Sequence, residues 1–166
     1  LKAMKGRMKI GVIEGDMATS NDAKRLKKYA DKGSVYQIRT ENYGGGCHLD
    51  AEMTAFAMRK IGLPKREYDL VIIENVGNLI CPADFNLGEH EKIVMLSVTE
   101  GDDKPLKYPV IFRSAGLVII SKTDLLKNTN FSMAKAKTNI RKVNRTAGVI
   151  EISFTNFDPW LKYLHK

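Results

Sequence analysis

Cysteine, tryptophan and long apolar runs are scarce in this 166-residue sequence, which contains two cysteines and one tryptophan. No apolar run approaches the ~20 residues that span a bilayer. The opening segment is too short in its apolar part to act as a secretory signal, and a small secreted scaffold would need more cysteines. These absences predict a cytoplasmic protein without a membrane segment. A content of 43% hydrophobic and 28% charged residues is typical of a globular domain.

The excess of positive charge, a formal +8, raises the question of nucleic-acid binding. The lysines and arginines are scattered, and those of the two segments 24–32 and 135–145 follow a pattern that indicates solvated helix faces. No basic stripe interleaved with aromatic residues occurs, as a single-stranded nucleic acid would require. We therefore expect no nucleic-acid partner, and a basic surface would equally suit an acidic protein.

Short runs rich in valine and isoleucine alternate with stretches of helical spacing. The runs predict buried strands at Lys9–Glu14, Val35–Arg39, Asp69–Glu74, Lys92–Val98, Leu117–Ser121 and Val149–Ser153. Helices are predicted at Asn21–Lys32, His48–Ile61, Lys104–Ala115, Ser132–Asn144 and Pro159–His165, the last with Asp158 as its N-cap. This alternation predicts an α/β fold: a single domain over 1–166, with a mostly parallel sheet covered by helices on both faces.

The two cysteines, Cys47 and Cys81, lie in polar surroundings rich in glycine or proline. Cys47 is followed by His48, and the three glycines before the pair supply the loop that two adjacent ligands need. Thiolates with an imidazole suit Zn²⁺ or Ni²⁺. Inert buried cysteines with a capping histidine are the commoner outcome in proteins generally. The polar setting nevertheless favours a metal or redox role over a structural disulfide, with the fourth ligand from water, His90 or a second chain.

Acidic residues and glycines follow several predicted strands, where ligands bind in parallel sheets. Asp16 and Glu74 each lie at a strand end close to a glycine, a placement that can hold Mg²⁺ near a phosphate. Gly77 would allow the backbone to approach a terminal phosphate. Helix N-caps are the alternative explanation for the two acids.

The tetrapeptide Ser121–Asp124 ends another buried strand. The carboxylate of Asp124 can accept both the ring N–H and the exocyclic amine of guanine, while the stem of Lys122 covers the base. Taken alone, the segment is better explained by a solvated turn. Together with the strand-end acids, it favours a guanine nucleotide, GTP or GDP.

Four runs of this sequence resemble the HypB family of nickel-incorporation GTPases. They are Glu14–Asp16, Gly46–Asp50, Ile73–Ala83 (IENVGNLICPA) and Ser97–Tyr108 (SVTEGDDKPLKY). The resemblance extends from about Lys9 to the C-terminus. It implies a P-loop GTPase-like fold and a homodimer that delivers nickel to the large subunit of [NiFe] hydrogenase together with other nickel-insertion accessory proteins.

The resemblance also implies roles for individual residues. A Zn²⁺ or Ni²⁺ site between protomers would use Cys47, His48 and Cys81. Asp16 and Glu74 would serve Mg²⁺ and the phosphate switch, and Lys107 would reach toward the partner's nucleotide. The remaining nucleotide contacts would come from Gly77, Lys122, Asp124 and Ser153.

Three departures from the family pattern stand out. Glu41–Tyr43 resembles a short insertion before the glycine-rich loop, and Ser121 stands where asparagine is commoner. No G-x-x-x-x-G-K-[ST] phosphate loop occurs in these residues. We therefore expect an N-terminally incomplete chain that lacks the first strand, phosphate loop and first helix and is inactive alone. The alternative is a non-enzymatic metal-binding module.

Overall fold

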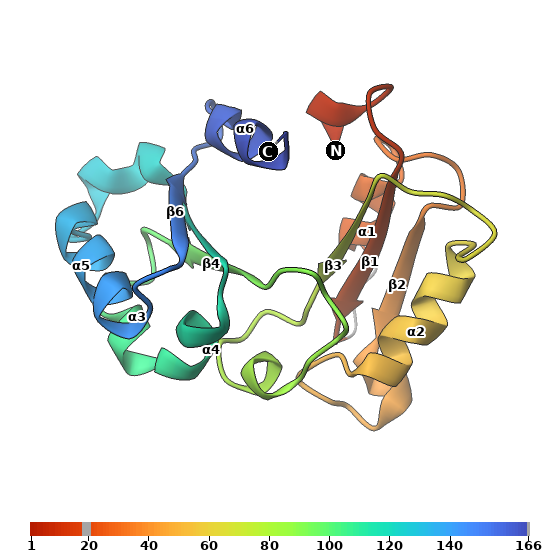
Figure 1. The fold of residues 1–166 in the computed structure, drawn as a ribbon, viewed down its shortest axis with the longest axis horizontal. Helices are drawn as coiled ribbons and strands as arrows, with labels where there is room; N and C mark the ends of the chain where they lie inside the picture. Colours follow the sequence, from red (N-terminus) through yellow and green to blue (C-terminus); the bar gives the residue numbers. More distant parts are fainter. Residues whose placement is uncertain (18–20, 166) are drawn as a thin grey trace. The chain divides into compact units, whose positions relative to one another are not determined.

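The computed structural model describes residues 1–17 and 21–165 and contains all six predicted strands, each within a few residues of its expected range (Figure 1). They are β1 (Ile10–Asp16), β2 (Val35–Arg39), β3 (Leu70–Glu74), β4 (Ile93–Ser97), β5 (Leu117–Ser121) and β6 (Gly148–Glu151). Every strand pair is parallel, as predicted from continuous apolar strands separated by helical stretches. The α/β fold class is confirmed.

Helices occupy the connections between the strands. The α-helices are α1 (Asn21–Leu26), α2 (Ala51–Lys60), α3 (Lys104–Lys107), α4 (Pro109–Ser114), α5 (Met133–Val143) and α6 (Asp158–Leu164). Short 3₁₀ helices are η1 (Lys2–Met4), η2 (Thr40–Tyr43), η3 (Cys81–Asp84) and η4 (Thr123–Asn128). Of the helices in the described ranges, none combines the length and apolar character needed to cross a membrane.

Two helix predictions need correction. The first helix ends at Leu26 rather than Lys32, and the like charges of Lys24, Lys28 and Lys32 at i, i+4 spacing disfavour its continuation. The last helix includes Asp158 as its first residue, with Phe157 at the N-cap position and no side-chain cap. Asp158 is therefore not the N-cap that the sequence suggested.

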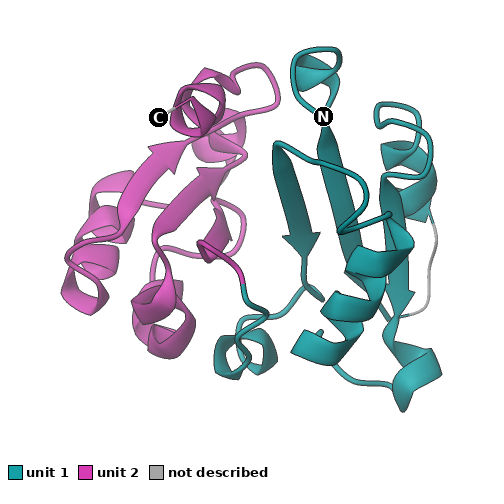
Figure 2. Cartoon of the chain, turned by 45° about the vertical axis from the view of Figure 1, so that its right-hand side comes forward, with its two compact units in different colours: residues 1–88 teal, residues 89–166 magenta. Residues whose placement is uncertain are grey.

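The chain divides into two compact units, Leu1–Gly88 and Glu89–Lys166 (Figure 2). Their strands form two three-stranded sheets, in the orders β2-β1-β3 and β4-β5-β6, rather than the one sheet expected. Apolar runs identify strands but not which edges pair, which is why the sequence could not exclude this arrangement. The single domain over 1–166 stays a prediction.

In the first unit β1 is the central strand and is buried along almost its whole length. Helix α2 packs on β1 and β2 through a cluster of fully buried apolar side chains. The cluster consists of Ile13, Ile38, Leu49, Ala57 and Ile61. Right-handed crossovers to strands on either side of β1 place α1 and α2 on opposite faces of this sheet (Figure 1).

In the second unit β5 is central and completely buried. Its residues Leu117 and Ile119 pack with Ile152 against Trp160 and Tyr163 of α6. The predicted helix Lys104–Ala115 is divided at Tyr108, because Pro109 lacks the N–H that would continue α3.

Asn144, which follows α5 and is only 8% exposed, joins three segments of this unit. Its Nδ2 donates to the carbonyls of Phe112, Arg113 and Ala115 at 2.8–3.1 Å. Its Oδ1 accepts from the backbone N–H of Ala147, among others, at 3.0 Å. One buried amide thus satisfies backbone groups at the end of α4 and at the entrance to β6.

Replacing Asn144 with alanine should lower the free energy of unfolding by about 3 kcal/mol, because buried carbonyls lose their donors. Urea denaturation followed by circular dichroism measures the change. Alanine at the exposed Asn128 is the matched control. Equal unfolding midpoints for the two variants would contradict this structural role.

Candidate metal centre and strand-end acids

The loop that carries Cys47 leaves β2 through the 3₁₀ helix η2 and turns at two glycines. Gly44 and Gly45 have φ values of 90° and 78°, a region that side chains disfavour. The N–H of Gly45 donates to the carbonyl of Thr40 at 2.9 Å and closes this turn. The insertion Glu41–Tyr43 is therefore contained within η2, and the chain leaves it directly toward Cys47.

Leu49 anchors the end of this loop in the core. Its side chain is 0% exposed, and a Cβ on Gly15 of β1 would lie 2.9 Å from its atoms. Only glycine at position 15 leaves that space. Asp50 then caps α2, its carboxylate accepting from the N–H of Met53 at 2.7 Å. Cys47 and His48 are thus placed between a glycine turn and a fixed helix start.

The three residues predicted to bind metal come together in the first unit. Ligand atoms of Cys47, His48 and Cys81 all lie within 4.8 Å of one another, and each residue is half-buried. Within the described ranges, these three alone form such a group of histidine, cysteine and acidic ligands. The sequence therefore identified a real cluster from two loops that are distant along the chain.

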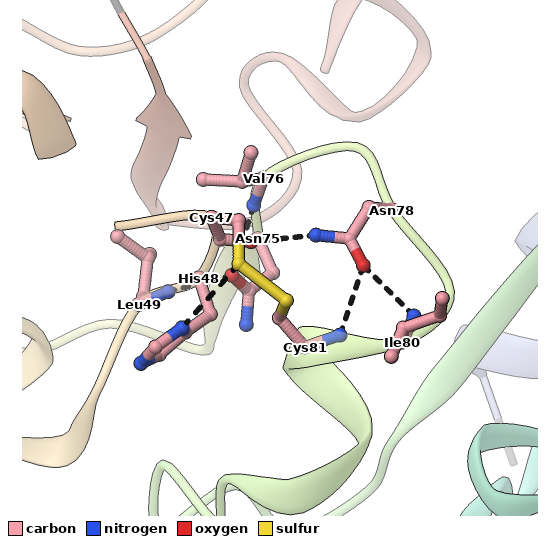
Figure 3. Close-up of a disulfide and its surroundings, with 8 residues drawn as sticks. All are labelled: Cys47, His48, Leu49, Asn75, Val76, Asn78, Ile80 and Cys81. Atoms are coloured by element: carbon pink, nitrogen blue, oxygen red, sulfur yellow. Dashed lines mark hydrogen bonds between the residues drawn. A yellow bond between two sulfur atoms is a disulfide. The ribbon is translucent and has the colours of Figure 1, made fainter. Parts of the chain in front are cut away.

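The same two cysteines are joined by a disulfide, with Cα atoms 6.2 Å apart (Figure 3). This corrects the sequence argument, which favoured a metal or redox role over a structural disulfide. The sequence argument placed both cysteines at one site, but residue types alone do not show whether the two sulfurs are reduced or joined.

The placement also fits a metal ion once the thiols are reduced. A tetrahedral ion with Zn–S bonds of about 2.3 Å and Zn–N bonds of about 2.1 Å separates its ligand atoms by about 3.5–3.8 Å. The Sγ of Cys47 lies 4.0 Å from Nδ1 of His48. Small side-chain rotations would therefore bring two thiolates and an imidazole to one ion. The donors are those that Zn²⁺ and Ni²⁺ accept.

The imidazole of His48 is held by stacking. Its ring lies 3.7 Å from that of Phe85, centroid to centroid, with an interplanar angle of 16°. Phe85 directly follows η3, which begins with Cys81. The segment that supplies the second cysteine therefore also orients the histidine.

Two asparagines that the sequence analysis did not single out connect the cysteine loops. Nδ2 of Asn78 donates to the carbonyl of Cys47 at 2.7 Å. Oδ1 of Asn75 accepts from the N–H of Leu49 at 2.8 Å. Asparagine is frequent in turns because its side chain bonds nearby backbone groups, but no sequence signal shows that the partner lies in another loop.

The acidic strand ends lie side by side in the sheet of the first unit. Glu14 pairs with Glu74 in the register of β1 and β3, and Asp16 ends β1. Partial desolvation, with the negative charges of Asp22 and Asp16, raises the pKa of Glu74. Asp16 and Glu74 are therefore brought to one edge, as predicted. Gly77 follows on the exposed loop, where a Cβ would meet no atom within 4 Å.

Glu14 is the unexpected member of this group, since it is only 3% exposed. Its Oε2 has no hydrogen-bond partner among the described residues. Burial, followed by the charges of Glu74, Asp16 and Asp22, raises its pKa to about 7, against the lowering effect of the Ala23 backbone. The sequence shows only that Glu14 ends a predicted strand, and this position does not indicate whether its side chain is buried.

The nucleotide residues predicted in the second unit lie near its strand ends. Lys122 follows β5 with a φ of 59°, in the left-handed region. The carboxylate of Asp124 accepts from the N–H of Phe154 at 3.3 Å, next to Ser153. The structure thus joins Asp124 to the loop after β6. Lys107 is exposed at the end of α3, its Nζ 5.7 Å from the ring centroid of Tyr108.

The raised pKa of Glu14 predicts a pH dependence of stability. The ordinary value is 4.5 and the folded value about 7, so between these values the native state binds more protons than the unfolded state. The free energy of unfolding therefore falls as pH rises through this window, by up to about 3 kcal/mol. Glu14→Gln should remove this fall and be the more stable form above pH 7.

Denaturant unfolding between pH 4.5 and 8 in the presence of a chelator measures this effect. Glu52→Gln, at an exposed position of α2, is the matched control. If Glu14→Gln kept the pH slope of the unchanged protein, Glu14 would not be the titrating group.

Comparison with known proteins identifies the family of the chain. The model of the CobW/HypB/UreG nucleotide-binding domain matches residues 1–151. The hydrogenase maturation factor HypB of Escherichia coli (strain K12) is 46% identical over 167 residues, which cover 99% of this chain and 55% of that protein. A probable HypB of Methanocaldococcus jannaschii is 39% identical over 166 residues, covering 98% and 72%.

A crystal structure of HypB from Helicobacter pylori in complex with nickel matches with a TM-score of 0.86 and 40% identity. The match covers 98% of this chain and 74% of that one. The fold is therefore the P-loop GTPase-like α/β fold of the HypB structures. The chain spans about half the length of its Escherichia coli relative. By its sequence and its fold alike, the chain belongs to the HypB branch of the CobW/HypB/UreG nucleotide-binding family.

Proposed function

We propose that this chain is the nickel-handling part of a GTP-dependent metallochaperone in the maturation of [NiFe] hydrogenase. The observation that carries the proposal is the cluster of Cys47, His48 and Cys81, one of whose loops begins at the strand-end acid Glu74. Related proteins are named as hydrogenase maturation factors, and one of them was crystallised with nickel. These names support the assignment of nickel as the cargo.

In this proposal the metal is bound by the reduced form of the cluster. The two thiolates and the imidazole would hold Ni²⁺, or Zn²⁺ in its place, with water or a second protomer completing the set. Thiolates require a reducing compartment, for which the cytoplasm is the natural assignment. Three ligands from one chain leave the ion accessible, which suits a cargo that must be passed on.

The nucleotide role rests on the strand-end residues. Asp16 and Glu74 would hold Mg²⁺, which neutralises charge on the phosphates when it is bound. Gly77 would contact the terminal phosphate, and Asp124 with Lys122 and Ser153 would bind the guanine. The segment 75–80 joins Glu74 directly to Cys81. Loss of the terminal phosphate could therefore move a metal ligand through one short loop.

The proposed partners follow from the same residues. A homodimer would bring two copies of the half-buried cluster together, and the exposed Lys107 would reach the partner's nucleotide. Delivery would be to the hydrogenase large subunit, with other nickel-insertion proteins. The second candidate function is a metal-binding module without hydrolysis, for which the ligand cluster alone would suffice.

The metal site can be tested by removing its ligands one at a time. In the reduced protein, Cys47→Ser and Cys81→Ser should each weaken Ni²⁺ binding by more than about 100-fold, beyond what a supporting residue contributes. Affinity should also fall as the pH falls, because thiols must lose their protons. Competition with a chromophoric chelator measures both effects.

His90→Ala is the matched control and should bind nickel unchanged, since His90 is not part of the cluster. Sedimentation with and without Ni²⁺ tests the shared site, and metal should promote dimerisation. A monomer that binds Ni²⁺ at full affinity would overturn the site between protomers.

The phosphate switch can be tested in the full-length natural protein. Glu74→Ala should slow GTP hydrolysis by about 100-fold or more while GDP binding changes little, because GDP lacks the terminal phosphate. Steady-state hydrolysis and GDP titration provide the two readouts, with Glu67→Ala at an exposed position as control. Equal losses of both would make Glu74 a structural residue. Undetectable hydrolysis in the unchanged protein would favour the metal-binding module.

A further inference from the structure

The two cysteines come from loops that no regular secondary structure holds together. Cys47 lies between the glycine turn and α2, whereas Cys81 begins η3 after the loop that leaves β3. We propose that Asn78 is a positioning residue that holds both cysteine loops in the arrangement that one metal ion requires. This inference rests on the proposed metal site and extends it to a residue that does not contact the ion.

The side-chain amide of Asn78 uses both of its ends (Figure 3). Nδ2 donates to the carbonyl of Cys47 at 2.7 Å. Oδ1 accepts from the N–H of Ile80 at 2.8 Å and from that of Cys81 at 2.9 Å. One half-buried amide is therefore bonded directly to the backbone of both metal-binding cysteines.

A side-chain amide suits this set of contacts, because it has a donor and an acceptor on one short side chain. A carboxylate accepts but cannot donate to the Cys47 carbonyl, and a hydroxyl on a single carbon is too short to span the two loops. Apolar side chains would leave the N–H of Cys81 without this partner.

Asn75 also connects the loop after β3 to the loop that carries Cys47. Its Oδ1 accepts from the N–H of Leu49 at 2.8 Å and from that of Val76 at 2.9 Å. The two asparagines therefore bond the backbone on either side of His48, at Cys47 and at Leu49. The three ligands thus belong to one hydrogen-bonded unit whose second half begins directly after Glu74.

Holding the ligands in place lowers the entropic cost of binding a metal ion. Ligands on two free loops must be ordered when an ion binds, whereas ligands held in advance lose less freedom. Removing partners that orient metal ligands commonly costs about 10–100-fold in affinity. Disulfide formation has the same entropic cost, because the two thiols must come together before the bond can form.

The oxidation provides a readout that needs no metal. With glutathione disulfide as oxidant, the thiols of Cys47 and Cys81 lose two electrons and two protons and form one S–S bond, while the oxidant becomes two molecules of glutathione. Two thiols that are held close together form a disulfide more readily than two thiols on free loops. The ratio of oxidised to reduced chain in a glutathione buffer therefore reports how well the thiols are placed.

The experiment compares the unchanged chain with Asn78→Ala and Asn78→Ser. The serine variant keeps a short acceptor for the turn but loses the bond to Cys47. Asn86→Ala is the matched control, because Oδ1 of Asn86 makes a similar local bond to the N–H of Gly88 at 2.8 Å. Ni²⁺ affinity is measured under reducing conditions by chelator competition and thiolate-to-nickel absorption. The disulfide equilibrium is measured without metal.

Both Asn78 variants should bind Ni²⁺ about 10–100-fold more weakly and shift the glutathione equilibrium toward the reduced chain. Asn86→Ala should change neither readout. Unchanged nickel affinity in both Asn78 variants would overturn the inference, as would weaker binding with an unchanged disulfide equilibrium. If the unchanged chain itself bound no nickel, the proposed function would fail, while the disulfide equilibrium would still decide whether Asn78 positions the thiols.

Discussion

The parallel pairing of β1 with β3 is the interaction on which the rest of the site depends. Its register sets Glu14 opposite Glu74, so that both strands end at one edge of the sheet. Beyond that edge, Gly15 leaves room for Leu49, which fixes the loop carrying Cys47, while the chain leaving β3 carries the second cysteine. A slip of one residue would turn these side chains to the other face of the sheet and separate the groups.

Concentrating acids at this edge has an electrostatic cost. Burial, together with the neighbouring carboxylates, raises the pKa of Glu14 and that of Glu74. Carboxylates this close together repel one another unless a positive charge lies near them. A divalent cation near Asp16 and Glu74 would reverse the sign of the local field. The Mg²⁺ of the proposed nucleotide site would therefore relieve the repulsion at this edge.

The sequence predicted the six strands well because continuous apolar runs leave few alternatives, as in Leu117–Ser121. It also predicted that Cys47, His48 and Cys81 form one cluster, by asking which residues follow the strands. It did not predict the two sheets, because edge pairing is not encoded in apolar pattern. The disulfide escaped prediction because residue types do not show whether two neighbouring sulfurs are joined. The bond of Asn78 to Cys47 escaped it because its partner lies 31 residues away in a loop without periodicity.

The disulfide and the proposed metal-binding arrangement would be two states of one placement rather than competing assignments. Both require the loops of Cys47 and Cys81 to meet, and both are served by the same amide. They differ in the sulfur chemistry, since an ion needs thiolates and oxidation removes them. His48 takes no part in the redox step and is stacked on Phe85 in this structure. In the proposed function of holding and releasing nickel, such a frame would keep the ligands ordered when the ion leaves.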